Sequence, residues 1–248
     1  MHLDDPRFPP LLEARPVKAP RRPFAEACRL VRAGELGAGD LLWSRNTARA
    51  ELAVVLEPEV ALERALQMGP LMMVALGDCL GALAPPKVAI HYRWPGGILL
   101  NGALAGAVRL AAPGAALAEV PRWLVAGAEL DIAAPRKERT EWSRTSLEEE
   151  AGRGLTRTDI LQSLSAHFLT WLNIWQEEGF RPVHDQWLFR AEGREAPARF
   201  ARGREEIEGR VVGLDEGAGL LLETGAGRVQ SLDLLPHVEV AEPSRAAP

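Results

Sequence analysis

One long stretch of the chain repeats apolar residues at helical spacing. The stripe consists of Ile160, Leu161, Leu164, Phe168, Trp171, Leu172 and Trp175. This spacing predicts an amphipathic helix that buries one face. Thr156 can cap its start, with Asp159 in the first turn, and Gly179 can end it because glycine tolerates the left-handed conformation there.

Two further helices follow from the same kind of pattern. Residues 24–31 predict a short one. A second is predicted to end at the prolines 85 and 86, and its apolar positions are Leu71, Met72, Ala75, Cys79 and Leu83. We expect this second helix to pack on a sheet.

Short apolar runs predict the strands of that sheet. They lie at residues 40–44, 51–58, 87–94 and 122–133. In the run at 87–94, Val88 and Ile90 alternate with His91 and Arg93, as in a strand with two unlike faces. The polar segment "RNTARA" at 45–50 is predicted to be a turn or loop, and residues 135–150 a charged loop.

A hairpin is predicted around Asn101-Gly102, since both central residues of its turn need a positive φ. Simple alternation then places Ala103, Ala105 and Ala107 on one face of the returning strand. Small residues on a strand allow close approach of another backbone, a packed helix or a flat ligand. The sequence leaves these three possibilities open.

The chain divides into three predicted parts. Residues 1–23 are rich in proline and form an extended arm, and residues 24–195 form a large α/β domain with a mixed sheet flanked by helices. After a charged linker at 191–206, residues 204–248 form a small all-β barrel with glycine turns. Because its tail at 205–240 can bury little apolar area alone, we expect it to depend on docking to the large domain.

Composition narrows the possible partners. The 248 residues are 47% hydrophobic, and the net charge of −5 gives no general attraction to nucleic acid or anionic lipid. We therefore expect neither nucleic acid nor a membrane as a partner. Cys28 and Cys79 are too few for a disulfide framework, and the first residues lack the pattern of a signal peptide. Both observations favour the cytoplasm.

Several motifs occur in the order of a known family. "YRWPGGILLNGALAGAV" resembles the strand-turn-strand of biotin protein ligases, where a Lys-Trp-Pro-Asn-Asp corner leads to a Lys-Leu-Ala-Gly return strand. "WLVAGAELDI" is similar to the Val-Gly-Ile-Gly-Leu-Asn-Val strand of that family. Residues 145–180 are similar to its Ser-Leu and long-helix segment, and residues 208–224 to its C-terminal SH3-like domain. The resemblance spans about residues 40–240.

This resemblance implies a biotin/lipoate protein ligase, with a class II synthetase-like sheet and an SH3-like barrel. It implies ATP and Mg²⁺ as cofactors, biotin, lipoate or octanoate as the carboxylic acid to be activated, and the lysine of a biotinyl or lipoyl carrier protein as acceptor. The ligand-binding positions that it assigns are Arg93, Trp94, Pro95, Gly96, Gly97, Ala103, Gly106, Arg45 and Arg49. No catalytic residue and no metal ligand is assigned.

The motifs depart from the family where the chemistry is expected. Arg45 and Arg49 lie in "RNTARA", which replaces a loop rich in glycine and arginine. Gly96 and Gly97 replace the Asn-Asp pair, and Ala103 replaces the lysine of the return strand. Acyl adenylation needs cations where negative charge develops, so these changes indicate a degenerate site.

Two classes of function remain open. One is an enzyme that activates a carboxylic acid with a rearranged set of arginines, and the other is a non-catalytic relative that binds a small molecule or protein. Transfer of a lipoyl or octanoyl group without ATP is a third possibility, with Lys87 as the nearest lysine. Glu129 and Asp131 alternate on one strand, either as a carboxylate pair for metal or acid/base chemistry or as a polar strand end.

Overall fold

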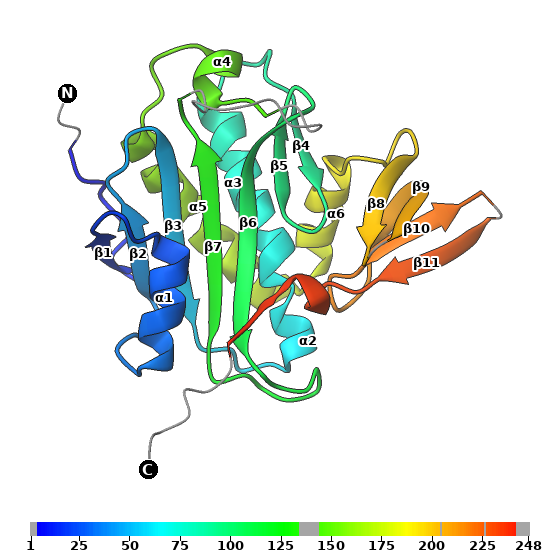
Figure 1. The fold of residues 1–248 in the computed structure, drawn as a ribbon, viewed down its shortest axis with the longest axis horizontal. Helices are drawn as coiled ribbons and strands as arrows, with labels where there is room; N and C mark the ends of the chain where they lie inside the picture. The colour runs from blue at the N-terminus through cyan, green and yellow to red at the C-terminus, as the bar shows by residue number, and fades with distance from the viewer. Residues whose placement is uncertain (1–3, 134–143, 204, 226, 242–248) are drawn as a thin grey trace.

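The chain folds around one large mixed β-sheet, with a smaller sheet to its side (Figure 1). The computed structural model describes residues 4–133, 144–203, 205–225 and 227–241. Residues 135–143 of the predicted charged loop lie outside these ranges. The predicted fold class, a mixed sheet with helices and a small C-terminal β-domain, is confirmed.

The large sheet has the strand order β1-β2-β3-β7-β6-β5-β4, and β12 pairs with β6 outside this path. Its strands are β1 (Glu13–Val17), β2 (Asp40–Ser44), β3 (Arg49–Leu56), β4 (Ile90–Arg93), β5 (Gly97–Leu100), β6 (Ala103–Pro113), β7 (Leu124–Asp131) and β12 (Glu239–Ala241). β1 runs parallel to β2 and β12 parallel to β6, and the other neighbours are antiparallel.

Helices cover the two faces of this sheet unequally (Figure 1). Both α3 (Met68–Leu83) and α5 (Arg157–Glu178) pack on one face, and α6 (Arg181–Phe189) packs against them. Among the described residues, the helix on the other face is α1 (Pro23–Arg32), which lies against β2, β3 and β7. The described helices therefore leave part of this face uncovered beyond the N-terminal end of α1. The short helices are α2 (Leu62–Ala65) and α4 (Leu147–Ala151).

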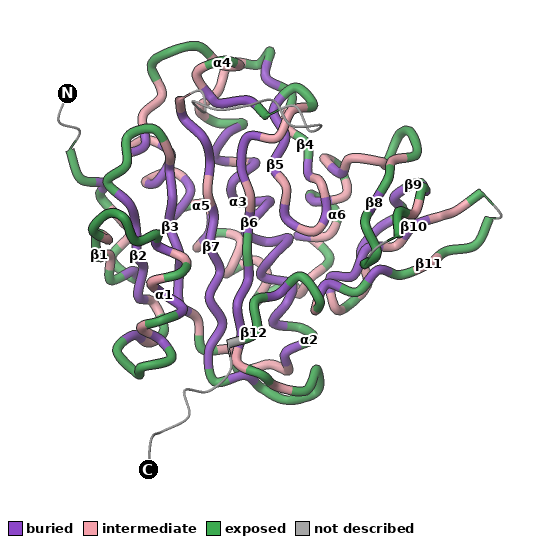
Figure 2. The backbone as a smooth tube through the Cα atoms, viewed as in Figure 1, coloured by how far each residue is buried: buried purple, intermediate pink, exposed green. Residues whose placement is uncertain are grey.

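The core helix is α3. Every residue from Leu71 to Leu76 is fully buried, and Figure 2 shows the same burial along the central strands. The stretch Leu62–Leu83 is long and apolar enough to cross a membrane, but 78% of its most apolar window is buried inside the fold. A helix that is apolar all round is the expected centre of a large core.

Short sequence motifs predicted the ends of α5 and the turn of one hairpin, and the structure contains both. Thr156 and Asp159 form a reciprocal capping box at the start of α5, and Gly179 ends the helix with a φ of 80°. Asn101 and Gly102 have φ values of 48° and 84°, as the predicted hairpin turn requires. These signals act within a few residues, so distant parts of the chain do not override them.

The predicted alanine face is wrong. Ala105 is fully buried on the α3 side, whereas Ala107 lines a cavity on the α1 side. The reason is a shift of register between Ile98 and Leu99, where β5 pairs first with Gly106 and then with Leu104. Such a bulge reverses the faces of the residues beyond it.

Two segments predicted to be irregular contain strands. Residues 13–17 of the arm form β1 at the edge of the large sheet. Residues 198–202 of the predicted linker form β8, in which only Phe200 is buried. The division into domains stays a prediction, although β12 returns the chain from the small sheet to the large one.

The small sheet docks on the large domain through buried polar contacts. Its antiparallel strands, in the order β11-β10-β9-β8, are β8 (Ala198–Arg202), β9 (Glu205–Leu214), β10 (Leu220–Thr224) and β11 (Arg228–Leu232). Gln67 is fully buried and donates through Nε2 to the Glu216 carbonyl at 2.7 Å. Trp175 Nε1 donates to Gln67 Oε1 at 2.6 Å, and Trp94 Nε1 donates to the Ala218 carbonyl at 3.2 Å.

Replacing Gln67 with methionine keeps the volume and removes both hydrogen bonds. Because Trp175 Nε1 and the Glu216 carbonyl then lose their buried partner, we expect the free energy of unfolding to fall by about 1–3 kcal/mol. Urea denaturation measures this. Gln176→Met on the exposed side of α5 is the matched control. Equal unfolding midpoints for the two variants would contradict the docking role of Gln67.

Candidate functional site

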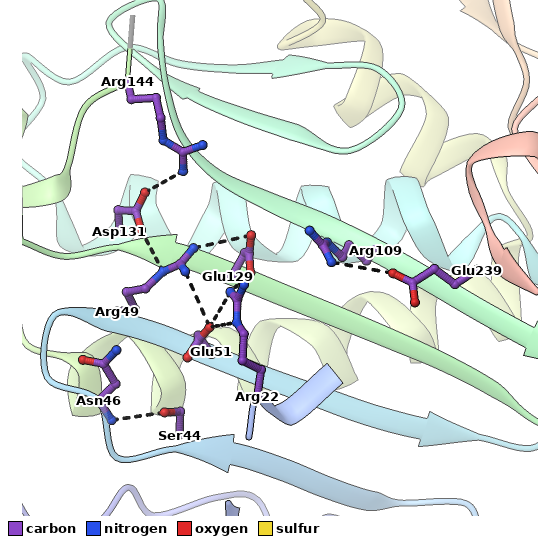
Figure 3. Close-up of polar contacts among 10 residues, drawn as sticks. All are labelled: Arg22, Ser44, Asn46, Arg49, Glu51, Arg109, Glu129, Asp131, Arg144 and Glu239. Atoms are coloured by element: carbon purple, nitrogen blue, oxygen red, sulfur yellow. Dashed lines mark hydrogen bonds and ion pairs between the residues drawn. The ribbon is translucent and has the colours of Figure 1, made fainter. Parts of the chain in front are cut away.

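The part of the sheet that α1 leaves open carries charged side chains (Figure 3). Pairing of β3 with β7 and of β7 with β6 places Glu51, Glu129 and Ala107 in one row. At the start of α1, Phe24 lies against Gly127, where an added Cβ would be 2.5 Å from the ring. The glycine thus lets α1 sit close to the sheet, and its N-terminus forms one wall of a cleft.

Arg49 stands two residues before Glu51 on β3 and reaches three carboxylates (Figure 3). Its Nε lies 2.8 Å from Asp131 Oδ1, as an ion pair without hydrogen-bond alignment. Its Nη2 is 3.5 Å from Glu129 Oε1, and its Nη1 is 3.9 Å from Glu51 Oε1. This guanidinium is the centre of the cluster.

Two more arginines complete the pairing. Arg22, just before α1, donates to Glu51 Oε1 from Nε at 2.8 Å and from Nη2 at 2.6 Å, and Nη2 also donates to Glu129. Burial lowers the pKa of Arg22, but hydrogen bonds and charge from both glutamates outweigh it, so the pKa is raised. Arg144 Nη2 donates to Asp131 Oδ2 at 2.9 Å. Each carboxylate of the cluster therefore has an arginine partner.

A cavity of about 120 Å³ lies between the start of α1 and this cluster, and Arg22, Phe24, Glu51, Ala107 and Glu129 contribute to its lining. The charged residues that line it are Arg22 and Arg109 with Glu51, Glu129 and Glu239, and both arginines are ion-paired with these glutamates. Within the described residues, no group of three or more His, Cys, Asp or Glu side chains could hold a metal ion. The geometry of Glu129 and Asp131 is that of ion pairing with arginine.

A larger hollow of about 790 Å³ lies between α5 and the end of β3. Its floor is mostly apolar, with Phe168 and Leu172 among the lining residues, and Arg64 stacks 5.9 Å from the centre of the Trp175 ring. None of the residues assigned to ligand binding from the sequence lines it. Size alone does not make it the site, and we place the candidate site at the charged cleft.

The Trp-Pro corner faces the small sheet and does not line the cleft. Trp94 is 5% exposed, and its ring meets His237 edge to face at 4.9 Å between centroids. Burial lowers the pKa of His237. Arg93 pairs with both carboxylate oxygens of Glu192, and Pro95 is half-buried beside it. These contacts hold the small sheet and the end of α6 in place.

The glycines of the hairpin allow backbone segments to approach closely. An added Cβ at Gly96 would lie 2.2 Å from the Val108 carbonyl oxygen, and one at Gly106 would lie 2.3 Å from the Glu129 carbonyl oxygen. At Gly97 the nearest atoms belong to Arg93, at 3.2 Å. At Gly96 and Gly106 the close neighbour is therefore the backbone of another strand. Ala103, beside the turn, is half-buried.

Arg45 and Arg49 do not act together. Arg45 lies at the β2–β3 turn, donates to Asp5 and stacks 5.3 Å from the centre of the Trp43 ring. Lys87, the proposed nucleophile for transfer without ATP, is exposed and does not line the cleft. Whether the assigned positions bind a ligand stays a prediction, and only Arg49 belongs to the cluster.

Cys28 and Cys79 lie in the hydrophobic core. Both are free and buried. Burial raises the pKa of Cys28 to about 12 and that of Cys79 to about 11. A thiol that stays protonated at neutral pH is a poor nucleophile, so neither residue is a candidate for covalent catalysis.

The sequence did not point to Arg22, Glu51 or Arg144. Glu51 alternates with Arg49 on one strand, and Glu129 alternates with Asp131 on another. These complementary pairs predict an ion-paired cluster only if β3 pairs with β7, and the sequence alone does not establish that pairing. Arg22 gave no signal, because its position follows from the placement of α1.

Comparisons with known proteins agree on one family. The sequence profile of the biotin/lipoate A/B protein ligase family matches residues 8–189. A biotin–[acetyl-CoA-carboxylase] ligase of Paracoccus denitrificans is 28% identical over 191 residues, which are 75% of this chain and 77% of that protein.

Solved structures show the same fold. A biotin protein ligase-like protein of unknown function from Silicibacter sp. TM1040 is 30% identical, with a TM-score of 0.84 over 94% of this chain and 98% of its own. The biotin protein ligase of Aquifex aeolicus in complex with biotin and ATP is 17% identical, with a TM-score of 0.69 over 88% and 94% of the two chains. At that identity the likeness shows the fold alone.

Replacing Gly106 with alanine tests the close approach of β6 to β7. The added Cβ would meet backbone atoms of Glu129 and Leu130, which cannot move without breaking strand pairing. We expect a loss of about 3 kcal/mol in the free energy of unfolding, at the upper end of the range for overpacking. Gly225→Ala, with nothing within 4 Å, is the control and should change it by less than about 0.5 kcal/mol. Similar losses in both variants would refute the close-approach argument.

Replacing Arg93 with alanine separates a structural role from a binding role. Because Arg93 is paired with Glu192, we expect the free energy of unfolding to fall by about 1.5–3 kcal/mol, the range for hydrogen bonds to charged groups. Chemical denaturation measures the loss. The exposed pair of Arg199 with Glu208 supplies the control, Arg199→Ala, with an expected loss below about 1 kcal/mol. Weakened binding of a carboxylate or phosphate ligand at unchanged stability would assign Arg93 to a binding site instead.

Proposed function

Because this chain belongs to the biotin/lipoate A/B protein ligase family, we propose that it is a divergent member whose cleft binds a small molecule without activating a carboxylate through ATP. The observation that carries this proposal is that the arginines of the cleft and of the adjoining cluster are already ion-paired. Arg22, Arg49 and Arg144 are already paired with carboxylates of the same chain. Stabilising an acyl adenylate requires cations that are available to the phosphate and the carboxylate.

The described residues do not fit Mg²⁺ and ATP. The cavity of about 120 Å³ is smaller than the pockets of about 300–1,000 Å³ that enclose typical ligands. A triphosphate placed there would have to compete with Glu51 and Glu129 for the guanidinium of Arg22. At the corner, Gly96 and Gly97 offer no side-chain oxygen to a metal ion.

The second candidate is an active ligase that transfers biotin, lipoate or octanoate to a carrier protein. The similarity to the Paracoccus denitrificans ligase favours it. In that case Arg22 would have to leave the glutamates when substrate binds, so that the cleft gains free positive charge. This candidate and the binding module differ in one measurable reaction, the reversible formation of an acyl adenylate.

We place the protein in the cytoplasm. Two free, buried cysteines and no disulfide among the described residues support a reducing compartment. Fractionation of cells followed by immunodetection tests this placement.

Pyrophosphate exchange into ATP tests the proposed function directly. With biotin, lipoate or octanoate as the acid and Mg²⁺ present, we expect no exchange above the rate without protein. The physical reason is that the paired arginines leave no cation for the developing charge. A ligase of this family assayed in parallel shows that the reagents are competent.

The change in melting temperature when the same acids and ATP are added measures binding independently of the exchange reaction. A ligand at a hundred times its Kd stabilises a protein by about 2.7 kcal/mol, and we expect a weak shift or none for biotin with ATP. Exchange of pyrophosphate into ATP at saturating biotin, together with a micromolar Kd for biotin, would overturn the proposal of a binding module and establish an active ligase.

A further inference from the structure

The cleft contains an electrostatic arrangement that calls for a cation. Glu51 and Glu129 are direct cross-strand partners on β3 and β7. Their side chains are only 8% and 17% exposed. Like charges directly opposite one another destabilise a sheet, and burial strengthens their repulsion. A positive group between them is therefore a requirement of the fold.

The group that fills this place comes from outside the sheet. Arg49 belongs to β3 itself and lies in the adjoining cluster, outside the lining of the cavity. Arg22 instead precedes α1, enters from the solvent side and is 43% exposed (Figure 3). Its guanidinium bridges the two glutamates in the manner of a bound ligand. Its side chain can swing out without disturbing any strand pairing.

The space beside this guanidinium accepts hydrogen bonds. The cavity of about 120 Å³ is lined by both glutamates, by the apolar Phe24, Leu52 and Ala107, and by Arg109, which is ion-paired with Glu239. Glu51 makes all its contacts with described residues through Oε1, so its Oε2 has no donor among them, although the side chain is 8% exposed. A carboxylate is only an acceptor and is satisfied by N–H groups.

We propose that this cleft recognises the head of a small organic cation that carries N–H donors, a guanidinium or a primary ammonium, and that Arg22 holds the place as an internal ligand until it is displaced. The inference rests on the proposed function and names the ligand class of the same site. The apolar wall at Phe24 and Ala107 accommodates a short aliphatic portion next to the charged head.

Arg22→Ala in the full chain opens the site for the experiment. Methylguanidinium, methylammonium and tetramethylammonium are titrated against it and against the wild type, with binding followed by NMR chemical shifts. We expect methylguanidinium to bind the variant at least tenfold more tightly than the wild type, since Arg22 no longer competes. Tetramethylammonium has the charge without N–H donors and should not distinguish the two proteins. Arg15→Ala, which removes an arginine paired with Asp40 at the sheet edge, should behave as the wild type.

A second substitution tests the acceptor. Adding Glu51→Gln to the Arg22→Ala variant should weaken methylguanidinium binding at least tenfold. If Arg22→Ala does not fold, Arg22→Gln is used for the same titrations. Equal binding to variant and wild type, binding that survives Glu51→Gln, or a preference for octanoate over methylguanidinium would each overturn the cation site. Pyrophosphate exchange does not depend on these titrations, so a positive exchange result would reject the proposed function alone.

Discussion

Glu51 and Glu129 face each other on adjacent strands, and the open half of the large sheet tolerates this because arginines neutralise the pair. The cations come from segments far apart in sequence, with Arg49 on β3 and Arg22 before α1. Arg22 directly precedes α1, so its contact with the glutamates and the packing of Phe24 on Gly127 occur together at the start of this helix. The guanidinium of Arg22 therefore neutralises the sheet beside the first helix and narrows the cleft.

The Trp-Pro corner has a separate role in this molecule. Trp94 and Arg93 hold the small sheet and Glu192, while Gln67 links α3 to the turn between β9 and β10. These are packing and docking contacts, and they do not depend on a ligand. A corner with such a structural role can persist while the charges on the open face change. This explains how a chain can retain the order of the family motifs and still carry an ion-paired cluster at its cleft.

Features that depend on neighbouring residues could be predicted from the sequence. The capping box at Thr156 and the turn at Asn101 act within a few residues, and α3 can be predicted as a core helix because it is apolar on all sides. The alanine face was wrong because the bulge in β6 reflects contact with β5, which alternation cannot foresee. β8 was missed because a single inward residue, Phe200, marks it as a strand among charged neighbours. The cluster around Arg49 depends on four segments that meet only in the folded chain.

The final strand has a consequence for how the molecule assembles. β12 follows the small sheet in sequence yet pairs with β6 in the middle of the large one, and Glu239 on it lies 3.6 Å from Arg109. The small sheet is thus held at both ends, leaving the large domain after α6 and rejoining it at β12. The pairing of β12 with β6 therefore closes a loop that contains the whole small sheet, and pairing between such distant segments costs loop-closure entropy that local pairing does not.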